Sequence, residues 1–327
     1  MTVRIGILGA AKIAPRALVE PGGEVADVEV FAVASRDPDR AKQFAQEHGL
    51  ARVFPSYEAL CDSGDVDAIY NALPISKHCE WTLRALESGK PVLCEKAFAS
   101  NALEAERMAE AASRTGLFLM EAFHWRYHPM AQRMIDLIQS GRLGAVRKIR
   151  SHFNVAIEDP TNIRLTYAMG GGATMDLGCY PLHMARHVLA EEPEVVSAVA
   201  ETGPPDVDID MRAQLRFPSG VEAEISCSMK KGAEFSMEFE AEGEQGRLHA
   251  INPLAPHGGN RLVVEVGGRS ESESVPGKST YFYQLEAFAQ AVKTGGFVPT
   301  GVDDAVLNMK ALDAIYRASG LKLRGLS

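Results

Sequence analysis

Three side chains suited to proton transfer stand at two places in the sequence. Lys96 follows Glu95 directly after an apolar run at 91–94, and Asp176 precedes Tyr180 by four residues. A charged pair at the end of a buried strand costs free energy unless it has a role. Residues four apart share one face of a helix, so Asp176 and Tyr180 are expected to point toward one site. We therefore expect acid–base chemistry at these residues.

A turn rich in glycine and alanine follows the first apolar run, Val3–Leu8. Its sequence at residues 9–14 is Gly-Ala-Ala-Lys-Ile-Ala, which has the GxGxxG spacing with alanine at the second and third glycine positions. Gly9 supplies a tight turn, Ala11 lets backbone amides approach a pyrophosphate, and Ala14 permits close helix packing. An ordinary strand–turn–helix start could carry the same letters, but the position at the first turn of a βαβ array favours a dinucleotide site. The residues assigned to the cofactor here are Gly9, Ala10, Ala11, Lys12 and Ile13.

The residues after the second apolar run indicate which dinucleotide is bound. Ser35 and Arg36 stand there, and Arg40 follows one helical turn later. NAD-specific sites usually have a carboxylate at this point for the ribose 2′-hydroxyl. A hydroxyl and two guanidinium groups suit a 2′-phosphate instead, so we expect NADP to be preferred over NAD. The alternative is a surface ion pair of Arg36 with Asp37 or Asp39.

The elements that position these residues follow from the pattern of apolar side chains. Residues 1–120 alternate short apolar runs with amphipathic stretches, as a parallel sheet covered by helices requires. A helix at 37–47 is expected to begin with Asp37 as N-cap and Pro38 at its first position. Further strands are expected at 67–73, 91–94 and 117–120. This half is expected to be a doubly wound α/β Rossmann domain at 1–122.

The second half has a different periodicity. Apolar residues alternate with polar ones at 211–217, 221–229 and 235–241. Period-two runs joined by short turns predict antiparallel strands with one apolar face. Loops are expected at 204–210 and 253–259, and helices at 283–294 and 303–319. We expect a substrate-binding and dimerisation α+β domain at 123–327, with an open, mostly antiparallel sheet and a C-terminal helix that packs back on the first domain.

Composition narrows the class of protein. The chain has 327 residues, 46% of them apolar and 24% charged, which is a globular balance with room for two domains. A net charge of -9 makes nucleic acid a poor partner. No run approaches the ~20 apolar residues of a membrane-spanning helix, and the first residues lack a signal-peptide pattern. The five cysteines are scattered without a CxxC pair, so we expect a cytoplasmic protein with neither zinc nor disulfides.

Taken together, the segments resemble the glucose–fructose oxidoreductase/inositol dehydrogenase/MocA family, whose signatures are a relaxed glycine loop, an E-K-P strand end and a D-x-G-x-[HY] helix. The closer similarity is to the branch of dimeric dihydrodiol dehydrogenases and NADP-dependent D-xylose dehydrogenases. That branch has tyrosine where Tyr180 stands, and its M-E-A-F-x-W-R-x-x-P segment resembles residues 120–129. One departure is Ala97, which stands in place of the family's proline.

The resemblance implies an NAD(P)-dependent dehydrogenase or reductase that acts on CH–OH groups. The implied partner is a small carbohydrate, polyol, dihydrodiol or dicarbonyl compound, and the implied assembly is a homodimer or higher homo-oligomer. Lys96 and Tyr180 would be the acid–base pair, because positive charge near a tyrosine makes it a usable base. Asp176 would orient the substrate hydroxyl or the lysine. Further residues assigned to the cofactor are Leu73, Pro74, His78, Glu95, Lys96, Trp125 and Arg126.

Several of these residues have structural alternatives. His78 could be a helix-surface histidine, and Trp125 with Arg126 could brace the domain junction instead of lining the cofactor cleft. Arg164 is either a substrate contact or a surface charge. His183 and His187 have the i,i+4 spacing of a metal pair, but histidines that pack or cap are commoner, and no metal is expected.

Two other functions remain open. One is a cofactor-binding regulator without turnover, since the family includes a galactose-responsive transcriptional inhibitor. Such a protein has no need of Lys96, Asp176 and Tyr180 together, and the sequence has all three. The other is an oxidoreductase that retains its cofactor and cycles between two substrates.

Overall fold

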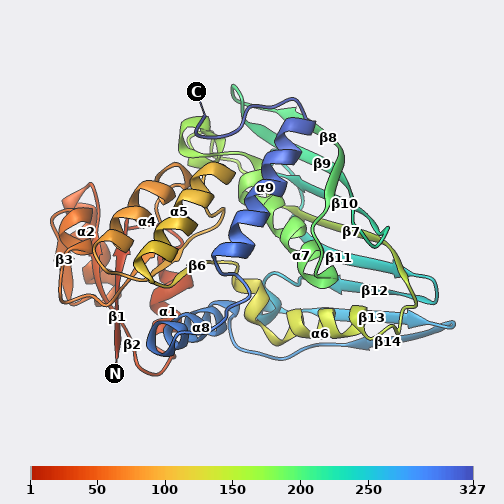
Figure 1. The fold of residues 1–327 in the computed structure, drawn as a ribbon, viewed down its shortest axis with the longest axis horizontal. Coiled ribbons are helices and arrows are strands. Elements are labelled where there is room, and N and C mark those ends of the chain that lie inside the picture. The colour runs from red at the N-terminus through yellow and green to blue at the C-terminus, as the bar shows by residue number, and fades with distance from the viewer. Residues whose placement is uncertain (1, 327) are drawn as a thin grey trace. The chain divides into compact units, whose positions relative to one another are not determined.

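The computed structural model describes residues 2–326, and the chain divides into two compact units. The first unit contains the chain up to His124 together with Tyr281–Val306. The second contains Trp125–Thr280 and the chain from Leu307 onward. In Figure 1 the first unit begins with the red and orange elements, and the green and cyan strands belong to the second.

The segment Tyr281–Val306 lies in the first unit, although the sequence placed it with the rest of 123–327. Hydrogen bonds explain this placement. The backbone amide of Glu121 donates to the carbonyl of Thr300 at 2.9 Å, and the Thr300 hydroxyl donates to the Glu121 carbonyl at 2.8 Å. These bonds attach the segment to the last strand of the first sheet.

The first unit is built on a six-stranded parallel sheet with the order β3-β2-β1-β4-β5-β6. This is the strand order of a dinucleotide-binding fold, and it confirms the expected fold class. The chain changes direction between β1 and β4, where the carboxyl ends of the strands leave a crevice in folds of this kind. The strands are β1 (Val3–Leu8), β2 (Val28–Ala34), β3 (Arg52–Phe54), β4 (Ala68–Asn71), β5 (Val92–Cys94) and β6 (Leu119–Glu121).

Helices connect these strands (Figure 1). The expected helix at 37–47 is present as α2 (Pro38–His48), and Asp37 is its N-cap, accepting hydrogen bonds from the amides of Asp39 and Arg40. The expected strand at 67–73 ends early, at Asn71, whose side chain accepts a hydrogen bond from the Leu73 amide. The remaining helical segments are the π-helix η1 (Pro15–Val19), α1 (Glu20–Gly22), α3 (Tyr57–Cys61), η2 (Ile75–Lys77), α4 (His78–Glu87), α5 (Ala102–Thr115) and α8 (Thr280–Thr294).

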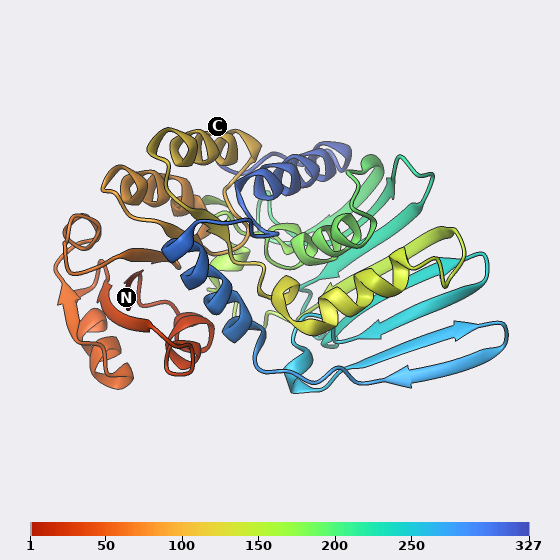
Figure 2. The same cartoon turned by 60° about the horizontal axis from the view of Figure 1, so that its bottom comes forward.

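The second unit contains an eight-stranded sheet with the order β14-β13-β12-β11-β7-β10-β9-β8. Its strands pair antiparallel except for the parallel pair β7–β10, which confirms a mostly antiparallel sheet. Helices α6 (Pro129–Gln139) and α7 (Cys179–Leu189) lie along one face of it (Figure 2). The strands are β7 (Val146–Asn154), β8 (Glu194–Thr202), β9 (Asp208–Arg216), β10 (Glu222–Ser228), β11 (Ser236–Gly243), β12 (Gly246–Ile251), β13 (Arg261–Val266) and β14 (Arg269–Glu273).

The expected alternation is present in β9, β10 and β11, where every second side chain is buried. The loop expected at 204–210 is shorter, because β9 already begins at Asp208, a carboxylate that is fully buried. The C-terminal helix expected at 303–319 is α9 (Val302–Ala318). Among residues 2–326, no helix has the length and apolar character needed to cross a membrane.

We expect the substitution His128→Asn to reduce the loss of stability on acidification. His128 caps α6, with its Nδ1 accepting a hydrogen bond from the Met130 amide at 3.1 Å. Burial, together with a smaller contribution from the charge of His257, lowers the pKa of His128 to about 4. An unfolded histidine titrates near pH 6.5, so the folded state binds fewer protons between about 6.5 and 4. The contribution of neutral His128 to the free energy of unfolding is therefore fully present above about pH 6.5 and is lost as the pH falls toward 4.

The measurement is the thermal unfolding midpoint at pH 7 and at pH 4.5. Asparagine keeps an N-cap acceptor without a titrating group, so the difference between the two midpoints should shrink in His128→Asn. A matched His48→Asn variant, at the end of α2, should keep the pH dependence of the unchanged protein. The same pH dependence in all three proteins would contradict the assignment to His128.

Candidate active site

The turn after β1 has the backbone that a pyrophosphate requires. Gly9 has a φ of 88°, and a Cβ at this position would lie 2.9 Å from Cδ2 of Leu73. A larger residue would therefore be strained and would collide with the segment after β4. Ala10 and Ala14 are buried, and the helical segment η1 starts directly afterwards. The alanines thus keep the close packing that glycines give in the stricter form of this turn.

Arg40 reaches this turn from α2. Its Nη2 donates to the carbonyl of Ala10 at 2.6 Å. Asp37 uses its carboxylate to cap α2, and Asp39 pairs with Lys42 at 3.2 Å. Within residues 2–326, neither aspartate forms an ion pair with Arg36, so the alternative for Arg36 is not realised.

The residues at this edge of the sheet fit a phosphorylated dinucleotide. Gly9 provides the close approach, and Ser35, Arg36 and Arg40 provide a hydroxyl and two guanidinium groups beside the end of β2. The nearest carboxylate, Asp37, is bonded to the backbone of its own helix. Among the described residues, Asp37 forms no ion pair with Arg36 or Arg40.

The substitution Arg36→Ala is expected to weaken NADPH binding while NADH binding stays nearly constant. Loss of a charge-assisted hydrogen bond to the 2′-phosphate should raise the dissociation constant of NADPH about 10- to 100-fold. Fluorescence titration of each reduced cofactor measures the two constants. Lys42→Ala, which removes an exposed cation from the helix α2 that follows Arg36, is the matched control and should change neither constant. An equal weakening of NADPH and NADH binding would rule out the role of Arg36 in selectivity.

His78 joins the ends of two neighbouring strands. It is 1% exposed, so the alternative of a helix-surface histidine is wrong. Its Nε2 lies 2.8 Å from the carbonyl oxygen of Leu73, after β4, and its Nδ1 lies 2.9 Å from that of Ala97, after β5. Burial lowers the pKa of His78, while hydrogen bonding to these carbonyls acts in the opposite direction. A neutral ring has one N–H, so it donates to only one of the two carbonyls.

Glu95 and Lys96 stand where β5 ends, and both are partly buried. The Tyr70 hydroxyl donates to Oε1 of Glu95 at 2.5 Å, and the Glu95 amide donates to the Asn71 carbonyl at 3.0 Å. The peptide bond between Lys96 and Ala97 is cis. The backbone around Lys96 is thus held on one side through β4 and on the other through His78.

Asp176 and Tyr180 lie in one helical run of the second unit. The π-helix η6 (Thr174–Gly178) carries Asp176 and continues directly into α7, which carries Tyr180. The π-helix is a wider turn than an α-helix, and Pro181 follows it in the first turn of α7, where its missing N–H is tolerated. The Tyr180 ring is buried and meets Phe153 of β7 edge-to-face at 5.8 Å.

Arg164 is an ion-pair partner of Asp176, which the sequence did not predict. Its Nε lies 2.6 Å from Oδ2 of Asp176. The Asp176 side chain is 14% exposed and that of Arg164 is 44% exposed, so the pair lies at a surface. Arg164 therefore orients a carboxylate that was itself proposed to orient the substrate.

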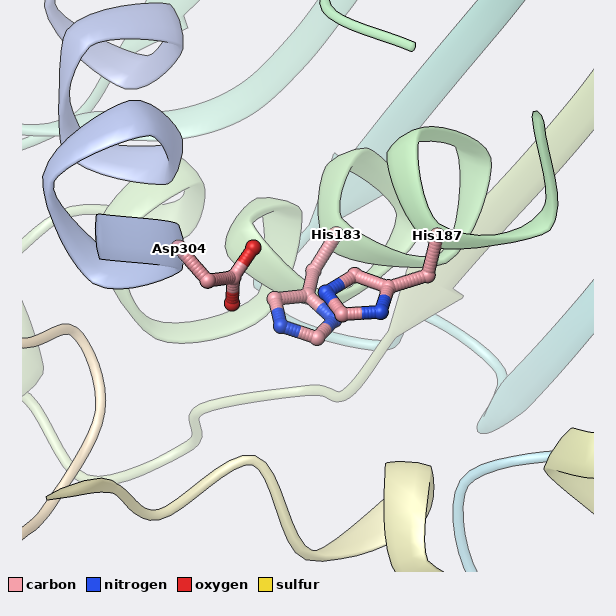
Figure 3. A group of neighbouring side chains, drawn as sticks. All are labelled: His183, His187 and Asp304. Carbon is pink, nitrogen blue, oxygen red and sulfur yellow. The ribbon is translucent and has the colours of Figure 1, made fainter. Parts of the chain in front are cut away.

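Trp125 and Arg126 bond to the two histidines of α7. The indole Nε1 of Trp125 donates to Nδ1 of His183 at 3.1 Å, and Nε of Arg126 donates to Nδ1 of His187 at 3.2 Å. The two imidazole rings stack with centroids 4.0 Å apart (Figure 3). Asp304, also labelled in Figure 3, belongs to the first unit. Trp125 is fully buried, and its hydrogen bond to His183 lies within the second unit.

The predicted site residues thus fall into two sets. In the first unit the structure places the cofactor residues around the ends of β1, β2, β4 and β5, namely Gly9, Ala10, Ala11, Lys12, Ile13, Ser35, Arg36, Arg40, Leu73, Pro74, His78, Glu95 and Lys96. In the second unit it places Trp125, Arg126, Arg164, Asp176 and Tyr180.

Comparisons with known proteins identify the family. Residues 3–123 match "Oxidoreductase family, NAD-binding Rossmann fold", and residues 131–249 match "GFO/IDH/MocA C-terminal domain". The chain belongs to the GFO/IDH/MocA oxidoreductase family. This GFO/IDH/MocA protein is 33% identical over 318 residues to D-xylose 1-dehydrogenase (NADP(+)) 2 of Haloferax volcanii, and the match covers 96% of each chain.

Two solved structures resemble the GFO/IDH/MocA chain along its whole length. A 3-ketoreductase from Actinomadura kijaniata, solved with NADP and TDP-benzene, has a TM-score of 0.91 and 31% identity, covering 97% of this chain and 98% of that chain. An aldose–aldose oxidoreductase from Caulobacter crescentus, solved with glycerol, has a TM-score of 0.90 and 28% identity, covering 98% of both. The ketoreductase was also solved with a lysine replaced by alanine or glutamate and with a tyrosine replaced by phenylalanine.

Proposed function

We propose that this oxidoreductase uses NADP and acts on a CH–OH group, or the corresponding carbonyl, of a sugar, polyol, dihydrodiol or dicarbonyl compound. The observation that carries the proposal is the presence of Lys96, Asp176 and Tyr180 together in a chain with both domains of an oxidoreductase family. The NADP-dependent xylose dehydrogenase and the ketoreductase solved with NADP support the choice of cofactor and substrate class. When bound, the cofactor gives or accepts the hydride.

The residues of this chain handle the proton. In the oxidation direction, Tyr180 takes the proton of the substrate hydroxyl through its phenolic oxygen, and in reduction it returns that proton. The Lys96 ammonium stabilises negative charge on the reacting oxygen of the substrate. Asp176, fixed by Arg164 at 2.6 Å, accepts a hydrogen bond from a substrate hydroxyl. The lysine and tyrosine replaced in the ketoreductase are the same two residue types, which supports this pair.

The remaining predicted residues bind the cofactor or support those that do. The turn at residues 9–13 contacts the pyrophosphate, and Ser35, Arg36 and Arg40 hold the 2′-phosphate. Leu73 and Pro74 line the end of β4, and Glu95 and Lys96 stand at the end of β5. His78 holds these two strand ends through its contacts with Leu73 and Ala97. Trp125 and Arg126 support α7, which carries Tyr180.

A second candidate function is an oxidoreductase that keeps its cofactor and cycles between two substrates. The whole-length likeness to an aldose–aldose oxidoreductase favours it over a regulator without turnover. Cofactor absorbance in the purified protein distinguishes this function, because a dehydrogenase that exchanges its cofactor would lose it during purification.

The cysteines bear on the cellular setting. The five cysteines are all buried and none is in a disulfide, which supports a cytoplasmic protein. We also propose a homodimer or higher homo-oligomer. Size-exclusion chromatography with light scattering tests it directly.

The experiment that tests the function follows nicotinamide absorbance with NADP⁺ or NAD⁺ against D-xylose, D-glucose, inositols and a trans-dihydrodiol. Turnover with NADP⁺ on any of these supports the proposal and narrows the substrate. A different result would favour a regulator without turnover. In that case the purified protein carries no cofactor, binds NADPH tightly and turns over none of these substrates.

A further inference from the structure

A fully buried ion pair lies beside the helical run that carries Asp176. Nη2 of Arg324 is 2.6 Å from Oδ1 of Asp208, and both side chains are 0% exposed. The Tyr316 hydroxyl donates to the same oxygen at 2.9 Å. A buried pair carries a large desolvation cost, so its presence is weak evidence for a stabilising role alone.

The other oxygen of Asp208 holds the start of η6. Oδ2 accepts hydrogen bonds from the Thr174 amide at 2.7 Å and from the Thr174 hydroxyl at 2.6 Å. Thr174 is two residues before Asp176 and is 1% exposed. Asp208 therefore acts as a cap at the turn of helix from which Asp176 projects.

The glycine turn before η6 is shaped around the same pair. Arg324 donates through Nε to the carbonyl of Gly171 at 2.8 Å. Gly172 has a φ of 146°, and a Cβ there would collide with Asp208, Arg324 and Tyr316. A Cβ on Gly171 would collide with the backbone carbonyl of Arg164. The turn thus packs against the buried pair on one side and against the Arg164 segment on the other.

The C-terminal segment also holds the loop that carries Arg164. The Tyr167 hydroxyl donates to the carbonyl of Leu323 at 2.5 Å, and the Arg324 guanidinium lies over the Tyr167 ring at 5.0 Å. Both members of the Arg164–Asp176 pair are therefore attached, through short covalent and hydrogen-bonded paths, to Arg324.

We propose that Arg324, Asp208 and Tyr316 are positioning residues for the reaction. They fix the Gly170–Gly172 turn so that Arg164 and Asp176 meet in one orientation and Asp176 presents its carboxylate to the substrate. All three side chains are buried, so they act through Asp176 and not by touching the substrate. The inference rests on the proposed function, and its physical basis is preorganisation, since small displacements of a catalytic group cost rate.

The first test is a double-mutant cycle between Tyr316→Phe and Asp176→Asn. Tyr316→Phe removes one hydrogen bond to Asp208 and should lower kcat/KM about tenfold. In the Asp176→Asn background it should have an effect below about twofold, because the residue through which it acts is already changed. The dissociation constant of NADPH should stay constant in every variant. Lys322→Ala, which removes an exposed ion pair to Asp206 on the same segment, is the control and should match the unchanged protein.

An equal loss in both backgrounds, no loss in either, or a parallel loss of NADPH binding would overturn the inference. Each of these results would assign Tyr316 to general stability or to no functional role.

The second test needs no turnover, so it separates failure of this inference from failure of the proposed function. Hydrogen exchange followed by mass spectrometry should show about tenfold faster exchange of peptides within 162–180 in Tyr316→Phe and in the milder Arg324→Lys. Peptides from the first sheet should exchange as in the unchanged protein. Unchanged exchange of 162–180 in both variants overturns the positioning role, whatever the activity panel shows. An inactive protein with the expected exchange pattern would refute the function and keep the structural coupling.

Discussion

Replacing Lys96 by methionine is expected to lower kcat/KM about a thousandfold while NADPH still binds. Methionine keeps an unbranched apolar stem but has no ammonium group to stabilise charge on the reacting oxygen. The neighbouring Glu95 cannot compensate, because it has the opposite charge and already accepts the Tyr70 hydroxyl at 2.5 Å. Steady-state kinetics on the best substrate of the panel measure the loss, and fluorescence titration measures NADPH binding.

A matched control for Lys96→Met is Lys90→Met. Lys90 stands before the start of β5, at the opposite end of the strand from Lys96, and its Nζ donates to the Val66 carbonyl at 2.6 Å. The turnover of Lys90→Met should be within about twofold of that of the unchanged protein. Retention of more than a tenth of the activity by Lys96→Met would refute the role of Lys96. A loss of NADPH affinity as large as the loss of turnover would make Lys96 a cofactor-binding residue instead.

The cofactor edge of the first unit could be predicted because its determinants are local. Gly9 needs a positive φ directly after a strand, and Asp37 with Pro38 marks the start of α2 within two positions. Such features depend only on residues that are adjacent in the chain, so they can be recognised in the sequence. By contrast, β3 was not predicted because its sequence Arg-Val-Phe lacks the continuous apolar run that marks β5, and α3 was not predicted because five residues are too few to show a helical period.

The second sheet was predicted only in part, and β7 shows the reason. Its inward-facing residues are Ile149, Ser151 and Phe153, and the small polar Ser151 interrupts the apolar alternation. The Ser151 hydroxyl donates to the Glu238 carbonyl of the neighbouring strand, which makes a polar residue acceptable there. The Glu238 carbonyl becomes the partner of Ser151 only when the strands pair. The sequence pattern alone therefore did not predict β7.

The contacts that shape the candidate site in the second unit are of long range. Arg164 and Asp176 are 12 residues apart, and Asp208 and Arg324 are 116 apart. Asp208 lies within the 204–210 stretch that composition predicts as a loop, yet it is a buried acceptor at the start of β9. No local pattern marks a carboxylate whose partners come from distant segments. The candidate catalytic residues could therefore be named from the sequence, whereas Asp208 and Arg324, which hold the turn before them, could not.

Replacing Tyr180 by phenylalanine should lower turnover about 10²- to 10⁴-fold, the usual contribution of a positioned general acid or base. The ring is 4% exposed and meets Phe153 edge-to-face, so phenylalanine fills the same space and the loss reports the hydroxyl alone. The pH dependence adds a second readout, because the limb of the rate profile due to the tyrosine should disappear in the variant. Tyr57→Phe, in the first unit against Trp81, is the matched control and should keep both rate and profile.

The outcome for Tyr180→Phe also decides how the other residues act. If turnover falls and the pH limb disappears, Tyr180 moves the proton, and Asp176 with Arg164 serves to orient the substrate. If the variant keeps its turnover, a group other than Tyr180 accepts the proton of the substrate hydroxyl. Asp176 is then the next candidate, since it is a carboxylate in the same helical run with a surface-exposed edge. A neighbouring cation makes a carboxylate a weaker base, so a base role for Asp176 predicts that Arg164→Gln raises the rate.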